Sequence, residues 1–165
     1  RLEELHMSKH APVLLQRNVT VTEGAADAFV QVTDPTAISA SAKVAWLIKR
    51  ISVMFDLDIA LETVSADFAI AWGVARASDT SVPSLDDKDT IYANGISGSL
   101  TTSGQILIPK LFEWDAPGEG LLMVDPQLFY TLDSTATGLA LSADFRVVYE
   151  EVTLSELEIL RLISN

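Results

Sequence analysis

The stretch that most constrains the fold of this chain is its C-terminal segment, residues 138–165. In the first half of the segment, apolar residues alternate with mainly polar ones, and the apolar set is Leu139, Leu141, Ala143, Phe145, Val147 and Tyr149. A period of two with one apolar face is typical of a half-buried β-strand. We therefore expect a long core strand here, with Phe145 and Tyr149 leading its buried face.

The period changes after this strand. Ser155 and Glu158 have the S-x-x-E spacing of a capping box, and Leu154 and Ile159 stand at the two positions of a hydrophobic staple. The pattern predicts a short C-terminal helix. Because such a helix is unstable alone, it must dock on its own sheet or on another copy of the chain. The candidate assembly contacts are the apolar residues of this tail: Leu154, Leu157, Ile159, Leu160 and Ile163.

Shorter alternating segments precede this strand, and turn residues separate them. We expect strands at residues 13–22, 28–33, 67–77, 91–96, 105–112, 121–124 and 128–132. Eight or nine strands with almost no helix predict an all-β antiparallel sandwich. Long polar connections favour Greek-key crossings and hence a jelly roll. An immunoglobulin-like sandwich is the alternative, weakened by the absence of a Cys…Trp…Cys spacing.

One segment is ambiguous. Residues 40–50 place apolar side chains at helical spacing, whereas residues 51–61 alternate in the manner of a strand. We favour one long strand from about Val44 to Leu61. The alternation then puts Lys49 inside, so we expect a bulge near this lysine. A helix over residues 40–50 is the alternative.

Length and composition set further limits. The 165 residues suit one domain, and we take residues 1–6 as a leader and residues 7–165 as the domain. A native amphipathic N-terminus is the alternative. The formal charge is −12 and no Lys/Arg cluster is present, which argues against direct nucleic-acid binding. No apolar run approaches the roughly 18 residues of a membrane span.

The residue types that carry most enzyme chemistry are scarce. The chain has no cysteine, which excludes disulfides, thiolate metal sites and a cysteine nucleophile. Its two histidines, His6 and His10, are too few for a cupin-type metal site, and a Ser-His-Asp triad would have to use His10 near a terminus. We therefore expect no enzymatic activity and no catalytic residue.

Two acidic groups suggest Ca²⁺ as a ligand. Asp56 and Asp58 project from one strand face, with Glu62 close behind them, and Asp86, Asp87 and Asp89 share a loop. We favour a solvated acidic surface for both groups, because no further ligand and no EF-hand spacing accompany them. The expectation is no cofactor, with Ca²⁺ as the weaker alternative.

A binding surface is a second possibility. Trp114 lies between two acids near a turn and is the aromatic residue most suited to exposure. Together with Tyr92, Asp86 and Asp87, it would form the ligand surface of a carbohydrate- or receptor-binding module. Small residues also line one face of the strand at 67–77, which allows close approach by another layer or another copy of the chain.

The order of features in the C-terminal half resembles a viral family. An isoleucine-proline strand at 106–110 precedes LLMVDPQLFYTLDSTATG, which leads into ADFRVVYEEVTLSELEILRLI. An R-x-x-Y closing strand and a tail beginning L-S-x-x-E are similar to those of small single-jelly-roll capsid or virion proteins. The likeness is carried by Arg146, Tyr149, Leu154, Ser155 and Glu158.

This resemblance implies a virus structural protein located in the virion. We expect it to assemble with copies of itself through cyclic trimers or pentamers and to contact other virion proteins. Capsid proteins that package a genome directly often have a basic N-terminal arm, whereas residues 7–25 hold only Lys9 and Arg17 as basic residues besides His10. We therefore expect a shell protein that does not neutralise nucleic acid itself.

Overall fold

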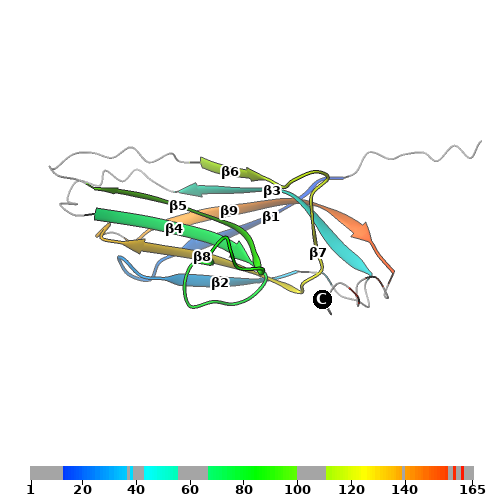
Figure 1. Ribbon diagram of the computed structural model, residues 1–165, viewed down its shortest axis with the longest axis horizontal. Helices are drawn as coiled ribbons and strands as arrows, with labels where there is room; N and C mark the ends of the chain where they lie inside the picture. Colours follow the sequence, from blue (N-terminus) through cyan, green and yellow to red (C-terminus); the bar gives the residue numbers. More distant parts are fainter. Residues whose placement is uncertain are drawn as a thin grey trace, which may run out of the picture.

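The computed structural model describes residues 13–36, 38, 43–55, 67–99, 111–138, 140–155, 158 and 161. These residues form nine strands in two antiparallel sheets that face each other (Figure 1). Sheet A contains β1 (Leu15–Thr22), β3 (Val44–Phe55), β6 (Leu111–Asp115), β7 (Leu121–Met123) and β9 (Ser142–Thr153). Sheet B contains β2 (Val30–Pro35), β4 (Asp67–Ala75), β5 (Thr90–Ser99) and β8 (Gln127–Thr135). The prediction of an all-β antiparallel sandwich is confirmed.

The strand pairs are nested, like those of one long hairpin. β1 pairs with β9, β2 with β8, β3 with β6, and β4 with β5. Wrapping this hairpin into two layers places β9 beside β3 and β8 beside β4. The sheet orders are therefore β1-β9-β3-β6 and β2-β8-β4-β5, with β7 as a side branch on β3. Strands far apart in sequence thus become neighbours in both layers.

β9 lies at the centre of sheet A, between β1 and β3. The predicted alternation is confirmed, because Ala143, Phe145, Val147 and Tyr149 are all at most 8% exposed. Phe145 meets Tyr130 of sheet B edge to face, with 5.4 Å between ring centroids. Each large apolar side chain buried in this way stabilises the fold by about 1.5–3 kcal/mol.

β3 resolves the ambiguous segment in favour of a strand as far as Phe55, so the helical alternative does not hold for residues 44–50. Its register against β9 shifts between Ile48 and Arg50, which is the bulge predicted near Lys49. The lysine is thereby kept out of the core, and its Nζ lies 3.1 Å from Glu150 Oε1. The part of the predicted strand beyond Phe55 lies outside the described residues.

β5 is longer than the predicted strand at 91–96, because the glycine- and serine-rich stretch after Ile96 continues to pair with β4. Gly98 explains the difference. A Cβ at this position would lie 2.6 Å from a ring atom of Phe68, so the glycine makes room for the aromatic ring. Glycine often marks a connection between strands, but Gly98 lies inside β5 and allows the ring of Phe68 to pack closely against the strand.

An ion pair closes one side of the sandwich. Arg17 interrupts the apolar face of β1, and its Nη2 and Nε lie 2.6 and 2.8 Å from the two carboxylate oxygens of Asp34 on β2. β1 and β2 are edge strands of different sheets, so this bidentate pair ties the two layers together. Asp34 is only 6% exposed.

Replacing Asp34 with asparagine is expected to lower the free energy of unfolding by about 1–2 kcal/mol, because it removes charged hydrogen bonds whose arginine end is open to water. Urea titration measures the loss. Asp115→Asn is the matched control, since Asp115 also accepts from an arginine but its side chain is 68% exposed. An equal loss in the two variants would contradict the bridging role of Arg17 and Asp34.

Candidate functional site

The outer face of sheet A holds a hollow of about 430 Å³. All the strands of the β1-β9-β3-β6 order contribute side chains to it: Asn18, Asp144, Arg146, Ser52, Met54, Leu111 and Glu113. The strand register puts Asn18, Arg146 and Ser52 in one row across the sheet, and Asp144 and Met54 in the next. The hollow is therefore a product of the pairing itself.

The hollow combines apolar and charged groups. Met54 and Leu111 are 47% and 51% exposed, and they oppose each other on β3 and β6. Arg146 Nε donates to Asn18 Oδ1 at 3.4 Å, and Glu113 lies 3.6 Å from Arg50. These neighbours hold the charges in place, and no activated nucleophile lines the described wall. The hollow therefore brings exposed apolar side chains and charged side chains together on one face of the sheet.

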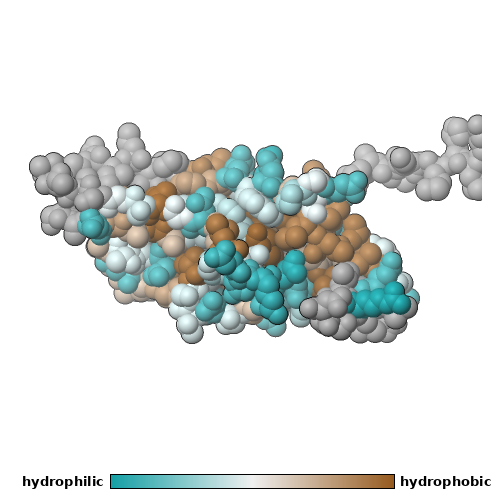
Figure 2. All heavy atoms as spheres, viewed as in Figure 1, coloured by the Kyte–Doolittle hydropathy of each residue, from teal (hydrophilic) through white to brown (hydrophobic). Residues whose placement is uncertain are grey.

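Further apolar surface gathers where β7 pairs with β3 (Figure 2). On β7, Leu121 and Leu122 are half-buried. Val13 and Leu14, directly before β1, are 72% and 59% exposed. Exposed apolar residues of this kind are typical of surfaces that meet other molecules.

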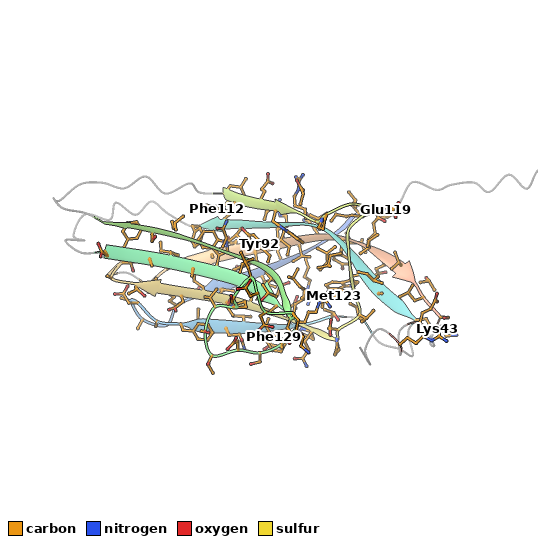
Figure 3. All side chains as sticks on the ribbon, viewed as in Figure 1. Lys43, Tyr92, Phe112, Glu119, Met123 and Phe129 are labelled. Atoms are coloured by element: carbon orange, nitrogen blue, oxygen red, sulfur yellow. The ribbon has the colours of Figure 1, made fainter. Side chains whose placement is uncertain are left out.

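The predicted assembly tail is described only at its start. The capping box is present, since Glu158 N donates to Ser155 Oγ at 3.3 Å and Glu158 Oε2 accepts from Ser155 N at 2.8 Å. Ser155 Oγ also donates to Glu158 Oε2 at 2.6 Å, and this bond, followed by the one from Ser155 N, lowers the pKa of Glu158. Leu154 is half-buried, and its N–H donates to the carbonyl of Lys43, at the start of β3 (Figure 3). The other candidate contacts, Leu157, Ile159, Leu160 and Ile163, lie outside the described residues, so the helix stays a prediction.

The proposed ligand-surface residues have different environments. Tyr92 is 5% exposed and lies between the sheets (Figure 3), where its hydroxyl accepts from Trp72 Nε1 at 3.3 Å. Trp114 is half-buried and stacks on Tyr92, with 6.0 Å between ring centroids. Asp86 and Asp87 are exposed in the loop at 76–89. Tyr92 therefore belongs to the core, and Trp114 packs on it.

The loop at 76–89 lies on the small-residue face of β4. A Cβ at Gly73 would lie 2.9 Å from Pro83 Cγ, so the proline sits directly on the strand. The small residues of β4 were expected to allow close approach by another layer. At Gly73 that layer is the loop at 76–89 of the same chain. A hollow of about 360 Å³ remains between the loop and β5, and its lining includes Leu85.

The proposed Ca²⁺ ligands Asp56, Asp58 and Glu62 lie outside the described residues. Within the described ranges, no three or more His, Cys, Asp or Glu side chains are placed to hold a metal ion. In the same part of the chain, no helix is long and apolar enough to cross a membrane.

Two carboxylates join the turns at one end of the sandwich, and sequence reasoning missed both. Glu23 is 3% exposed, and its Oε2 accepts from Leu141 N at 2.8 Å and from Ser134 Oγ at 3.0 Å. Glu23 Oε1 is buried without a partner among the described atoms. Asp27 accepts from Thr137 N at 2.7 Å. The turn after β1 is thereby tied to the turn between β8 and β9.

The two carboxylates titrate in opposite directions. Burial raises the pKa of Glu23, and the bonds from Leu141 and Ser134 offset this only in part. For Asp27, partial desolvation works to raise the pKa, but the bonds from Thr137 and Gly138 outweigh it and lower the pKa. Donors of the chain itself bond to both oxygens of Asp27 and to Oε2 of Glu23, so these two carboxylates hold the turns together.

No family model and no curated protein matches this sequence. The function is therefore inferred from the fold and from the chemistry of the described residues.

Glu23→Gln and Asp27→Asn should change the pH dependence of stability with opposite signs. Because the folded pKa of Glu23 is raised, its contribution is full below pH 4.5 and is lost as the pH rises through the raised pKa. The unfolding free energy of the wild type relative to Glu23→Gln should therefore fall as the pH rises above 4.5. The folded pKa of Asp27 is lowered, so its contribution to stability is present above pH 3.8 and is lost as the pH falls through the lowered pKa. The wild-type advantage over Asp27→Asn should therefore be lost on acidification.

Urea titrations at several pH values measure both differences. Parallel pH profiles for the wild type and Glu23→Gln would show that Glu23 titrates as freely in the folded chain as in the unfolded one.

Proposed function

We propose that this protein is a virus structural protein, a jelly-roll capsid subunit that assembles with copies of itself through cyclic oligomers. The observation that carries the proposal is the nested strand pairing. Setting the side branch β7 aside, β1·β9, β2·β8, β3·β6 and β4·β5 form one hairpin wrapped into two four-stranded layers. A jelly roll has eight strands in two such sheets, and viral capsid domains are among its main users.

The chemistry of the described residues supports a structural role over the other uses of the fold. A cupin enzyme needs a histidine cluster for its metal, and the sequence holds only His6 and His10. The hollow on sheet A offers paired charges and exposed Met54 and Leu111, which fit a contact surface. Because fold alone does not determine function, the self-assembly is the part that experiment must test.

The second candidate function, a carbohydrate- or receptor-binding module, has less support. It requires Trp114 and Tyr92 on an open surface, whereas Tyr92 is buried and bonded to Trp72. Trp114 is half-buried, so a part of its side chain remains accessible to a ligand. Binding to a glycan array that disappears in Trp114→Ala would favour this function over the first.

Light scattering on concentrated protein is expected to show trimers or pentamers, and electron micrographs should show closed shells. High salt should favour assembly, because a formal charge of −12 on each copy is repulsive and salt screens it. A strict monomer at high protein concentration and high salt would count against the proposal.

Deleting residues 154–165 is expected to reduce assembly more than folding, because the predicted helix docks on another copy in this proposal. Near-UV circular dichroism reports the fold, and light scattering reports assembly. Glu158→Ala should show a weaker form of the same loss, since it removes the capping box at Ser155. Glu151→Ala, an exposed acid on β9 outside the cap, is the matched control. A truncated chain that still assembles but unfolds more readily would assign the tail to its own sheet.

A further inference from the structure

The edges of the two sheets differ in how they are protected. Natural proteins block exposed edge strands with charged residues and proline, since these discourage pairing with another chain. Arg17 lies on β1, Asp34 and Pro35 end β2, and Glu113 and Asp115 lie on β6. β7, beside β3, is a short edge of three residues. The remaining edge, β5, runs for ten residues with the sequence TIYANGISGS and has neither a charge nor a proline.

The hydrogen-bonding groups on the free side of β5 can be assigned. Gly95 N donates to its neighbour's side chain, Asn94 Oδ1, at 2.8 Å, so this N–H is not used in pairing with β4. In an antiparallel strand, every second residue directs its N–H and C=O to the same side. Ala93, Gly95 and Ser97 therefore present their backbone groups to the free side. Within the described ranges, β4 is the strand that pairs with β5.

An exposed apolar side chain stands beside this edge. Leu85 is 75% exposed, the highest value among the large hydrophobic residues of the described chain. It lines the same hollow as Ala93, Asn94 and Gly95. An uncharged free edge and an uncovered leucine thus lie next to each other, which is the combination that a partner strand would cover.

We propose that β5 pairs with β5 of a second copy, antiparallel and about a two-fold axis at Gly95. Residues opposite each other in an antiparallel pair lie on the same face of the sheet. The two-fold axis must therefore pass midway between the two copies of one residue, which face each other across it. With Gly95 opposite Gly95, Ala93 comes opposite Ser97, and all the free backbone groups of these residues find partners.

The partner is a second copy because the edge is complementary to itself. Opposed side chains on the outer face are small, and no like charges meet although each chain has a formal charge of −12. Pairing requires Asn94 to release Gly95 N, so Asn94 limits the association of free monomers. The contact is independent of the proposed capsid function, because a two-fold strand pair needs no shell.

Cysteine trapping tests both the contact and its register, and the chain contains no cysteine to interfere. In the double variant Ala93→Cys/Ser97→Cys, each new cysteine faces one of the partner, with Cα atoms about 5.5 Å apart. This separation is within disulfide range. Mild oxidation is expected to give a covalent dimer, detected by non-reducing electrophoresis and mass spectrometry. Within one chain the two positions are roughly 13 Å apart, too far to bridge.

The single variants Ala93→Cys and Ser97→Cys are the matched controls, because in this register their cysteines lie about 13 Å apart along the paired strands. Both should stay unlinked, as should Thr135→Cys, which shares the outer face of sheet B but lies on β8. Near-UV circular dichroism of the reduced proteins checks folding. A double variant that links no faster than the single variants would overturn the proposal.

Asn94→Ala provides a second measurement without cysteine. Freeing Gly95 N on both copies should raise the dimer association constant in sedimentation equilibrium about tenfold or more, since two intrachain hydrogen bonds no longer have to be broken per dimer. Ser97→Lys should lower it, while Thr135→Lys, with the same charge on the same face, should not. A dimer fraction that is unchanged in both Asn94→Ala and Ser97→Lys would also overturn the proposal.

Discussion

The structure depends on β9 being a central strand with one face that is apolar from Ala143 to Tyr149. It bonds to β1 on one side and to β3 on the other, so its backbone groups are used on both edges. Its inward residues then have to meet a second apolar layer, and Phe145 finds Tyr130 there. A central strand of this kind fixes the register of its neighbours, since a slip of one residue would turn Phe145 and Val147 to solvent. The hollow on sheet A is a consequence of that register.

Polar contacts hold together the sides and ends of the sandwich, which the apolar core does not reach. Apolar packing holds two layers together but leaves the sides and ends of a sandwich open. Arg17 and Asp34 close the side at β1 and β2, and Glu23 with Asp27 ties the turns at one end. The cost of burying Glu23 is visible in its raised pKa. These groups fix how the two layers and their turns are placed relative to one another.

The sequence predicted the features of the structure that depend on residues close together in the chain. The alternation of β9, the capping box at Ser155 and the bulge near Lys49 all follow from short-range rules, because a buried lysine or an uncapped helix end is costly wherever it occurs. The partner of Arg17 and the ring that fills the space at Gly98 come from other strands, so no window of the sequence contains them. The core position of Tyr92 was missed for the same reason, since its bond to Trp72 depends on how β4 and β5 pair.

The nested pairing also has a consequence for the order of folding. Leu15 pairs with Tyr149 and Thr22 with Ser142, so β1 waits for almost the whole chain before it has a partner. Forming such distant contacts costs the entropy of closing a large loop before the stabilising contacts are made, and this slows folding. On the ribosome, sheet A cannot form until β9 has emerged, and one edge of β3 stays without its partner strand until then. The outer face of sheet A is therefore completed late, because the row of Asn18, Arg146 and Ser52 requires β1, β9 and β3 to be paired.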